Sequence, residues 1–294
     1  MIAQIRSFLA VLEEGSLHRA AARLRLSQSS LSRQMQALEH ELGGRLLDRT
    51  STGVRPTNGG YALAAKMSGV LDSYDAAMVA VRRLVRGDSE QLRIGCVASA
   101  VRDHLEPALV KLRKDHPEAK IKLLDLSPGE QIAALRRGEI DVALLDQGEN
   151  ILSRDFYVRK IAVIPSLVIL PADHRLALRK KVRLAELKDE TFVSGTDADM
   201  PGYNRRVTQM CRKHGKFRPK FIGQPQSFAE GLALVVNDDA ILLLPSFVRH
   251  QTTPCATMVP ITDEEATWNV FVVWQRGQTT GPLRALLKAL LRIA

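Results

Sequence analysis

The sequence predicts an N-terminal winged helix-turn-helix, a long linker helix and an α/β body of two lobes. An apolar helical stripe, a polar helix face and a basic loop mark the first sixty residues. Apolar residues then recur at heptad-like steps of four and three between residues 60 and 86. From Leu92 onward, strand-like and helix-like segments alternate, which is typical of parallel βαβ units.

Residues 27–42 predict the second helix of a helix-turn-helix. One face is apolar, with residues at steps of four, three and four: Leu31, Met35, Leu38 and Leu42. The other face carries side chains that hydrogen-bond to base edges and phosphates: Gln28, Ser29, Ser32, Arg33 and Gln36. Ser27 is a natural N-cap, and a short helix over 17–24 precedes it, as the motif requires. A helical hairpin with a polar outer face is the alternative interpretation.

The loop from Asp48 to Gly60 predicts a basic wing beside that helix. Gly43 and Gly44 end the helix, and the loop that follows is rich in Thr, Ser and Gly. Arg45, Arg49 and Arg55 crowd this segment. Such a loop is short enough to lie along a groove of DNA next to the recognition helix.

The run EEGSLHRAAARLRLSQSSLSRQMQALEHELGGRLLDRTSTGVRPTNGG resembles the DNA-binding end of the LysR-type transcriptional regulators. The residues in register are Ala20, Ala21, Leu24, Ser27, Gln28, Leu31, Ser32, Leu38, Glu39, Leu42, Gly43, Leu46, Arg49, Thr57 and Gly60. The departures are His18, where Thr or Ser is usual, Gly44 and Leu47. The helix face, the wing and the resemblance together predict contacts to double-stranded DNA by Gln28, Ser29, Ser30, Ser32, Arg33, Gln36, Arg49, Arg55 and Thr57.

Composition agrees with this interpretation without locating the site. The net charge of +10 favours polyanionic partners, but the first sixty residues hold eight arginines and five acids, and so contribute only +3. The three cysteines are far apart, which predicts no structural disulfide and a cytoplasmic location. The histidines form no metal-ligand pattern, and no apolar run is long enough to span a membrane. We therefore expect no metal, no cofactor and no membrane partner.

The segment from about residue 60 to 86 predicts a long amphipathic helix, about 40 Å in length at 1.5 Å per residue. Its apolar seam consists of Met67, Leu71, Tyr74, Met78, Val81 and Val85. The seam either packs on the body of the same chain or pairs with a second copy, parallel or antiparallel. Pairing is favoured because a helix-turn-helix protein usually reads two half-sites. We expect a homo-oligomer, a dimer or a tetramer.

The remaining residues predict two α/β lobes around a cleft. Strands are expected at 92–97, 121–126, 140–145, 162–170, 191–194, 220–222, 241–244 and 267–274, and helices at 101–116, 128–137, 201–214, 227–236 and 282–293. The expected domains are 1–59, 60–88 and 89–294, with lobe I at about 89–161 and 267–294 and lobe II at about 162–266. The segment LRRGEIDVALL and the Pro-Gly-Tyr of 201–203 also resemble the LysR-type family, which implies a periplasmic-binding-protein-like effector domain.

In lobe I, effector contacts are expected where strands end and helices begin. Ser99 either holds a carboxylate or only caps a helix, and the resemblance places a family hydroxyl at this position. Arg102 is either its charge partner or a solvated arginine. Ser127 and Pro128 are the other candidate contacts of this lobe, with a helix cap as the alternative. Ser127 opens a capping box with Glu130, and Pro128 stands where the family usually has a hydroxyl, which counts against a ligand there.

In lobe II, the resemblance implies effector contacts by Ser194, Thr196, Pro201, Gly202 and Phe228. Tyr203 and Phe228 would supply apolar walls. A small organic carboxylate is the expected effector, because a helix N-terminus and an arginine both favour an anion.

These features predict a sequence-specific DNA-binding transcriptional regulator whose activity a small-molecule effector modulates. A two-lobed enzyme is one alternative, but the sequence has no phosphate loop, nucleophile elbow, paired carboxylates with a nearby base, or metal cluster. A small-molecule binding protein that does not act on DNA is the other alternative. The intact face of Gln28, Ser29, Ser32 and Arg33 argues against it.

Overall fold

A computed structural model describes residues 1–50, 53–85, 91–97, 104–146, 152, 156–251, 254–276 and 279–293. The backbone alone is described at Arg49, Thr50, Leu84, Arg292 and Ile293. The chain divides into two compact units, Met1–Met78 and Val79–Ala294. Each unit is described by itself.

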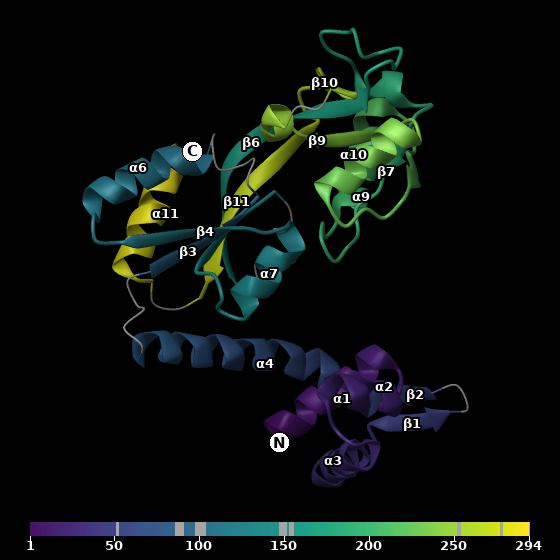
Figure 1. The fold of residues 1–294 in the computed structure, drawn as a ribbon, viewed down its shortest axis with the longest axis vertical. Helices are drawn as coiled ribbons and strands as arrows, with labels where there is room; N and C mark the ends of the chain where they lie inside the picture. The colour runs from purple at the N-terminus through teal and green to yellow at the C-terminus, as the bar shows by residue number, and fades with distance from the viewer. Residues whose placement is uncertain are drawn as a thin grey trace. The chain divides into compact units, whose positions relative to one another are not determined.

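The first unit is a three-helix domain with a two-stranded wing and the first part of a long helix (Figure 1). Its elements are α1 (Ile2–Glu14), α2 (Leu17–Leu24), α3 (Gln28–Glu41), β1 (Leu47–Thr50), β2 (Gly53–Pro56) and α4 (Asn58–Val85). Phe8, Leu31 and Leu38 are fully buried where the three helices meet. Ser16 and Ser27 cap α2 and α3, each accepting a hydrogen bond from the backbone three residues later.

The predicted apolar stripe of α3 is correct at three positions and wrong at the fourth. Leu31, Met35 and Leu38 are buried, whereas Leu42 is 48% exposed. Leu42 is the C-cap after Glu41; its backbone is still αR and its amide still bonds to the carbonyl of Leu38, but its side chain lies at the helix end and outside the core. Gly43 follows in the left-handed conformation, which agrees with the predicted helix end.

The predicted seam of α4 divides into two parts. Met67 and Leu71 pack against the core of the first unit, because three short helices enclose too little apolar surface alone. For these two residues, packing on the same chain, the alternative to pairing with a second copy, is confirmed. The other four members remain exposed: Tyr74, Met78, Val81 and Val85.

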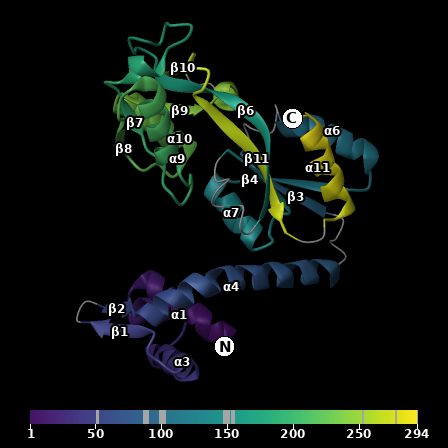
Figure 2. The ribbon, with the colours of Figure 1, turned by 180° about the vertical axis from the view of Figure 1, so that it is seen from behind.

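The second unit is built on a nine-stranded sheet that runs through two lobes (Figures 1 and 2). The strand order is β4-β3-β5-β11-β6-β9-β7-β8, and β10 also pairs with β6. The strands are β3 (Gln91–Cys96), β4 (Lys120–Asp125), β5 (Val142–Leu145), β6 (Phe156–Pro171), β7 (Thr191–Val193), β8 (Lys220–Ile222), β9 (Ala240–Pro245), β10 (Ala256–Pro260) and β11 (Thr267–Gln275). The neighbouring strands β3, β4 and β5 are parallel, as are β7, β8 and β9, so each lobe has its own parallel core.

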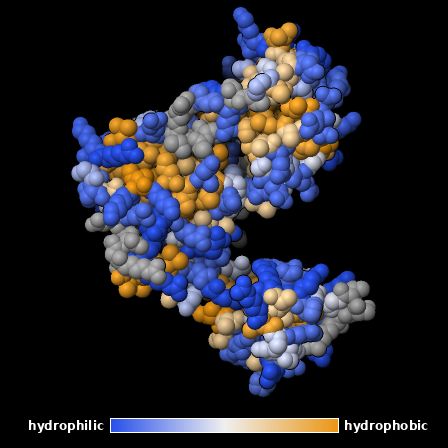
Figure 3. Space-filling model, in the orientation of Figure 1, coloured by the Kyte–Doolittle hydropathy of each residue, from blue (hydrophilic) through white to orange (hydrophobic). Residues whose placement is uncertain are grey.

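Helices cover both faces of the sheet in the first lobe, with α6 beside α11 on one face and α7 on the other (Figures 1 and 2). The helices of this unit are α6 (Glu106–Asp115), α7 (Pro128–Arg136), α9 (Tyr203–Met210), α10 (Phe228–Asn237) and α11 (Gly281–Ile293). Short 3-10 turns occupy Leu184–Leu187 and Ser246–His250, and a π turn, Cys211–Gly215, extends α9. Apolar side chains gather on the surface of the first lobe (Figure 3), where Val110, Leu123 and Leu291 are exposed.

Two long strands, β6 and β11, pass from one lobe into the other side by side. Residues 162–165 of β6 pair with one half of β11, and residues 156–160 pair with the other. The register shifts between Val270 and Phe271, opposite Ile161, which leaves a bulge at the crossover. On β6 the bulge lies at residue 161, the last residue of the expected lobe I, while on β11 it lies after Val270, inside the expected lobe I segment that begins at 267.

Candidate DNA-binding surface and effector site

The polar face of α3 is available to a partner. Gln28, Ser29, Arg33 and Gln36 are exposed, and Ser30 and Ser32 are half-buried at its margin. Because Ser27 satisfies the backbone amide of Ser30 at 3.1 Å, the first turn of the helix is fixed. The side chains that the sequence predicts as base readers therefore lie on one exposed face of a capped helix.

Glu39 joins the wing to this helix, although from the sequence it is only one of the residues that match the family. Its Oε1 accepts hydrogen bonds from the backbone amides of Leu46 at 2.8 Å and Leu47 at 3.1 Å. A carboxylate that holds two amides fixes the start of β1 relative to α3. Across the strand pair, the exposed Arg55 faces Asp48, while the side chain of Arg49 lies outside the described residues.

Thr57, which the sequence predicts as a DNA contact, also has a structural role. Its hydroxyl donates to the carbonyl of Arg45 at 2.8 Å and accepts from the amide of Gly60 at 3.1 Å. A Cβ at Gly60 would lie only 2.2 Å from the carbonyl oxygen of Leu46, so the chain passes very close to the wing there. Thr57 thus joins the end of the wing to the start of α4.

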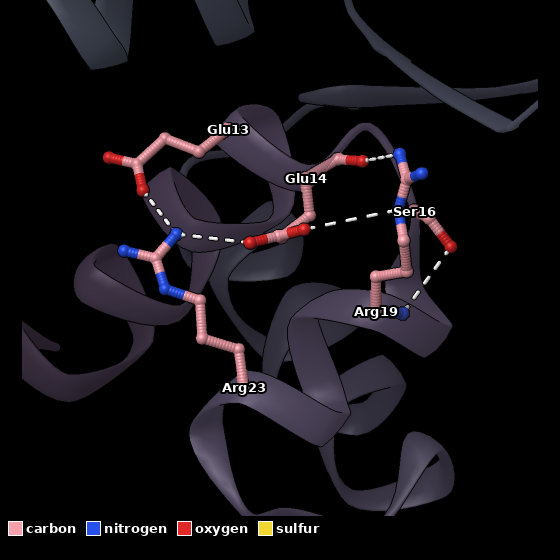
Figure 4. A network of polar contacts seen from close by, with 5 residues as sticks. All are labelled: Glu13, Glu14, Ser16, Arg19 and Arg23. Carbon is pink, nitrogen blue, oxygen red and sulfur yellow. Dashed lines mark hydrogen bonds and ion pairs between the residues drawn. The ribbon is translucent and has the colours of Figure 1, made fainter. Parts of the chain in front are cut away.

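A network of ion pairs holds α1 against α2 (Figure 4). Arg23 reaches Glu13 at 2.6 Å and Glu14 at 3.2 Å, and Arg19 contacts the same Glu14. These carboxylates raise the pKa of the Arg23 guanidinium. The two arginines of α2 are therefore engaged in ion pairs within the domain, whereas the Nε of Arg33 on α3 donates to the carbonyl of Ser29 in its own helix, at 3.5 Å.

In the first lobe, two of the expected effector contacts, Ser99 and Arg102, lie outside the described residues. Ser127 forms the capping box that the sequence predicts. Its amide donates to Glu130 Oε2 at 2.8 Å, and its Oγ accepts from the amide of Glu130 at 3.3 Å. Pro128 is buried at the first position of α7. Both residues therefore serve the start of this helix.

In the second lobe, the expected contacts lie around one loop before α9. Ser194 is buried and donates its hydroxyl to the carbonyl of Gly223. Thr196 Oγ1 bonds to Asp199 Oδ2 at 2.5 Å, so both polar groups are paired within the loop. Gly202 adopts φ +82°, and its amide donates a hydrogen bond to Asp197 Oδ1 at 3.1 Å. Pro201, beside it, is half-buried.

The two aromatic residues expected as walls differ in position. Tyr203 is 1% exposed, stacks on Trp268 with ring centroids 6.0 Å apart, and donates its hydroxyl to Leu243 at 3.1 Å. Burial raises its pKa. Phe228 is half-buried at the start of α10 and packs against the core. Tyr203 is thus part of the core beneath the loop.

The two lobes touch where α7 begins. The backbone amide of Gly129 donates to the carbonyl of Asp199, at 2.8 Å, across the lobe boundary. A Cβ on Gly129 would lie 1.6 Å from the carbonyl oxygen of Ala198, so only glycine allows this approach. The structure therefore brings together Ser127 and Pro128 of one lobe and the 196–202 loop of the other.

Three polar side chains of the effector domain were not singled out from the sequence: Gln131, Asp146 and Trp268. Each holds a buried nitrogen or oxygen atom that lacks a hydrogen-bond partner within the described part of the chain. Burial raises the pKa of Asp146 to about 6. Such residues give no periodic pattern, so only the folded arrangement reveals them.

Both units match known families over nearly the whole chain. Residues 2–61 match the family described as bacterial regulatory helix-turn-helix protein, lysR family. Residues 86–294 match the LysR substrate binding domain. The chain belongs to the LysR family. It is a DNA-binding transcriptional regulator with an effector-binding domain, as its two matched parts require.

Several LysR-type relatives share most of this length. The transcriptional regulator YnfL of Escherichia coli is 32% identical over 289 residues, which cover 95% of this chain and 93% of YnfL. BenM of Acinetobacter baylyi is 29% identical over 271 residues, covering 91% and 88%. The crystal structure of full-length BenM, 25% identical, superposes with a TM-score of 0.57 over 100% of this chain and 96% of that one. BenM has also been crystallised as an effector-binding domain with its effector benzoate.

The described part of this LysR-type chain has three further properties. No group of three or more His, Cys, Asp or Glu side chains there is arranged to hold a metal ion. None of its helices is long and apolar enough to cross a membrane. All three cysteines are free, with Cys96 and Cys211 buried and Cys255 exposed.

Proposed function

We propose that this regulator reads its operator through α3 and the wing, and that a small molecule bound where the two lobes meet controls the outcome. The observation that carries the proposal is the exposed polar face of α3 next to an anchored basic wing. Gln28 and Arg33 read base edges in the major groove, while Ser29 and Arg55 contact phosphates. In this proposal the protein acts on DNA in the cytoplasm and carries out no catalytic step.

Two copies act together. A helix-turn-helix protein reads two half-sites one helical turn apart, which requires two recognition helices. The exposed residues Tyr74, Met78, Val81 and Val85 lie along one side of α4 and fit the same side of a second α4. Apolar side chains that are exposed to solvent in one chain become buried in the pair, and this burial drives association.

The effector acts through the contact between α7 and the 196–202 loop. Closure of the lobes forms the hydrogen bond from Gly129 to Asp199, and separation of the lobes breaks it. An effector shifts the balance only if it binds the two arrangements with different affinity. Changed lobe geometry then alters the spacing of the paired DNA-binding units and hence the bend of the operator.

Operator binding tests this proposal directly. The operator is first selected from genomic fragments, and its affinity is measured by fluorescence anisotropy at several salt concentrations. Gln28→Ala and Arg33→Ala should each weaken specific binding by roughly 1–3 kcal/mol, because each removes a base contact. Arg55→Ala should weaken all duplexes alike and flatten the salt dependence, since a phosphate contact carries no sequence information.

Arg113→Ala is the matched control, because Arg113 is an exposed arginine on α6, in the effector domain. It should bind the operator as the parent does. The assignment of α3 is refuted if Gln28→Ala, Arg33→Ala and Arg113→Ala all retain the parent affinity.

A further inference from the structure

Two neighbouring residues of α1, Arg6 and Ser7, contact two different helices of the first unit. Ser7 donates its hydroxyl to Gln34 Oε1 of α3 at 2.7 Å. Arg6 Nη2 donates to Asp75 Oδ1 of α4, and the two side chains form an ion pair. Figures 1 and 2 both show α1 between α3 and the first part of α4. Adjacent positions of the first helix are thus joined to the recognition helix and to the long helix.

Ser7 makes the buried contact. It is 6% exposed, and its neighbour Phe8 is fully buried in the core of the unit. A buried hydroxyl destabilises the fold unless it is paired, and Gln34 supplies its partner. Because a hydrogen bond depends on direction, this pair is satisfied only over a narrow range of rotation of α3 about its axis. Gln34 follows Arg33 in α3, so the contact also fixes the direction of the polar face.

Arg6 and Asp75 make the exposed contact. The side chain of Arg6 is 45% exposed and that of Asp75 is 31% exposed. Leu71 lies one turn before Asp75 on the same side of α4 and packs into the core of the unit. An exposed ion pair adds little to the free energy of unfolding. It can nevertheless favour one orientation of α4 among those that keep Leu71 packed.

We propose that these side chains are positioning residues for operator recognition, and that α1 couples the long helix to the recognition helix. The inference rests on the proposed reading of the operator by α3. Two chains paired through α4 hold two recognition helices, and the orientation of each α4 sets the distance between them. Ser7 then determines how well each α3 fits its half-site. Arg6 determines which separation of the half-sites fits the pair.

A purely structural role of the two contacts predicts a different result. If they only stabilised the fold, losing either one would lower the folded fraction and weaken binding to every duplex by one common factor. In the proposed roles, the loss of Ser7 and the loss of Arg6 change two different properties of operator binding. The full-length protein distinguishes these cases.

Fluorescence anisotropy with two kinds of duplex is the measurement. The first kind carries one half-site of the selected operator. The second carries both half-sites, at the natural separation or with one or two base pairs added or removed between them. Ser7→Ala should weaken binding to the single half-site about three- to tenfold, the usual effect of one hydrogen bond. It should keep the order of preference among separations that the parent has.

Arg6→Gln and Asp75→Asn should instead change the preference among separations. Each removes the ion pair, so the ratio of affinities between the natural and the altered separations should fall about two- to fivefold. The two variants change the net charge in opposite directions, and their general attraction to DNA therefore shifts in opposite directions. A loss of preference that both variants share comes from the lost contact rather than from charge.

Arg113→Gln and Asp115→Asn are the charge-matched controls, because both residues are exposed on α6 in the effector domain. They should keep the preference of the parent, and urea unfolding shows that each variant is folded under the conditions of binding. The inference is overturned if Arg6→Gln and Asp75→Asn also keep that preference. It is overturned as well if Ser7→Ala binds the single half-site like the parent, or weakens all duplexes by the same factor as Arg6→Gln.

Failure of this inference is distinguishable from failure of the proposed function. Gln28→Ala and Arg33→Ala remove base contacts directly, so they should weaken the single half-site whatever the role of α1. If they do so while the variants of Arg6 and Ser7 behave like the parent, α3 reads the operator and the coupling through α1 alone is refuted. If Gln28→Ala and Arg33→Ala bind like the parent, the proposed reading by α3 is itself refuted.

Discussion

The amide of Gly129 donates a hydrogen bond to the carbonyl of Asp199, and this 2.8 Å contact joins the two lobes of the effector domain. Gly129 lies in the first turn of α7, where amides have no partner within the helix. The second lobe thus supplies the acceptor that this amide needs. In this arrangement of the lobes, the contact between them also completes the start of α7.

Gly129→Ala should disfavour this closed arrangement. The added methyl group would meet the carbonyl oxygen of Ala198 at 1.6 Å, so the lobes must move apart or the loop must shift. We expect a loss of stability of roughly 1–3 kcal/mol in thermal or urea unfolding, which is the usual cost of overpacking. The effector should also change the operator footprint less than in the parent.

Gly281→Ala is the matched control, because Gly281 also lies at a helix start and its added Cβ would come no closer than 4.0 Å to His116. Alanine there favours the helix without a clash. If Gly129→Ala is as stable as Gly281→Ala, the contact between lobes does not exist in solution.

The last turn of α4 is held to the effector domain by an ion pair. Arg83 Nη1 lies 2.5 Å from Asp141 Oδ1, and Asp141 Oδ2 also accepts from the amide of Arg93 at 2.7 Å. The two side chains are only 16% and 20% exposed. Asp141→Asn should therefore cost about 1–3 kcal/mol, since it leaves a shielded guanidinium without its counter-charge.

Urea unfolding of Asp141→Asn, with hydrogen exchange at the end of α4, measures this effect. The amides of the last turn should exchange faster because the helix end is no longer anchored. Asp115→Asn on α6 removes an exposed carboxylate and should change neither quantity. Equal exchange in the parent and in Asp141→Asn would show that the ion pair does not hold this helix end.

Met78→Asp tests the pairing of the long helices. Met78 is 36% exposed and lies between Tyr74 and Val81 on the outward side of α4. A carboxylate there would have to lose its water in a paired state, which opposes association. Sedimentation at micromolar concentration should show a monomer, and operator affinity should fall with it.

Ala80→Asp introduces the same charge on another exposed side of α4 and should remain paired. Should the parent protein itself sediment as a monomer on its operator, pairing through α4 is excluded.

Much of the DNA-binding unit could be predicted because its signals are local. The bounds of α2 and the cap at Ser27 depend on neighbouring residues only, and so does the capping box at Ser127 in the effector domain. The failures come from tertiary contacts. Leu71 fits a heptad seam by spacing, yet it fills the core of the first unit, which periodicity alone does not reveal.

The candidate effector site was less predictable for the same reason. Tyr203 follows a family-like Pro-Gly, but its ring position depends on Trp268, which is distant in the sequence. The strand β10 was missed, and the first half of β6 as well, since both rely on pairing with remote strands. The role of Gly129 could not be predicted from the sequence, because it depends on the carbonyl of Ala198 in the other lobe.

Asp146 should make the stability of the effector domain depend on pH. Burial raises its pKa in the folded protein to about 6, above the ordinary value of 3.8, so the fold favours the protonated carboxyl. The phenol of Tyr203 is the titratable group within its electrostatic reach, and it stays neutral at these pH values because its own pKa is raised. The contribution of this group to the free energy of unfolding is therefore present at about pH 4 and is lost as the pH rises above 6.

Asp146→Asn should be more stable than the parent at pH 8 by roughly 1–3 kcal/mol, and about equally stable at pH 4. Urea unfolding at both pH values measures the difference, with Asp115→Asn as the exposed control. An equal gain at both pH values would show that the carboxylate of Asp146 is not desolvated.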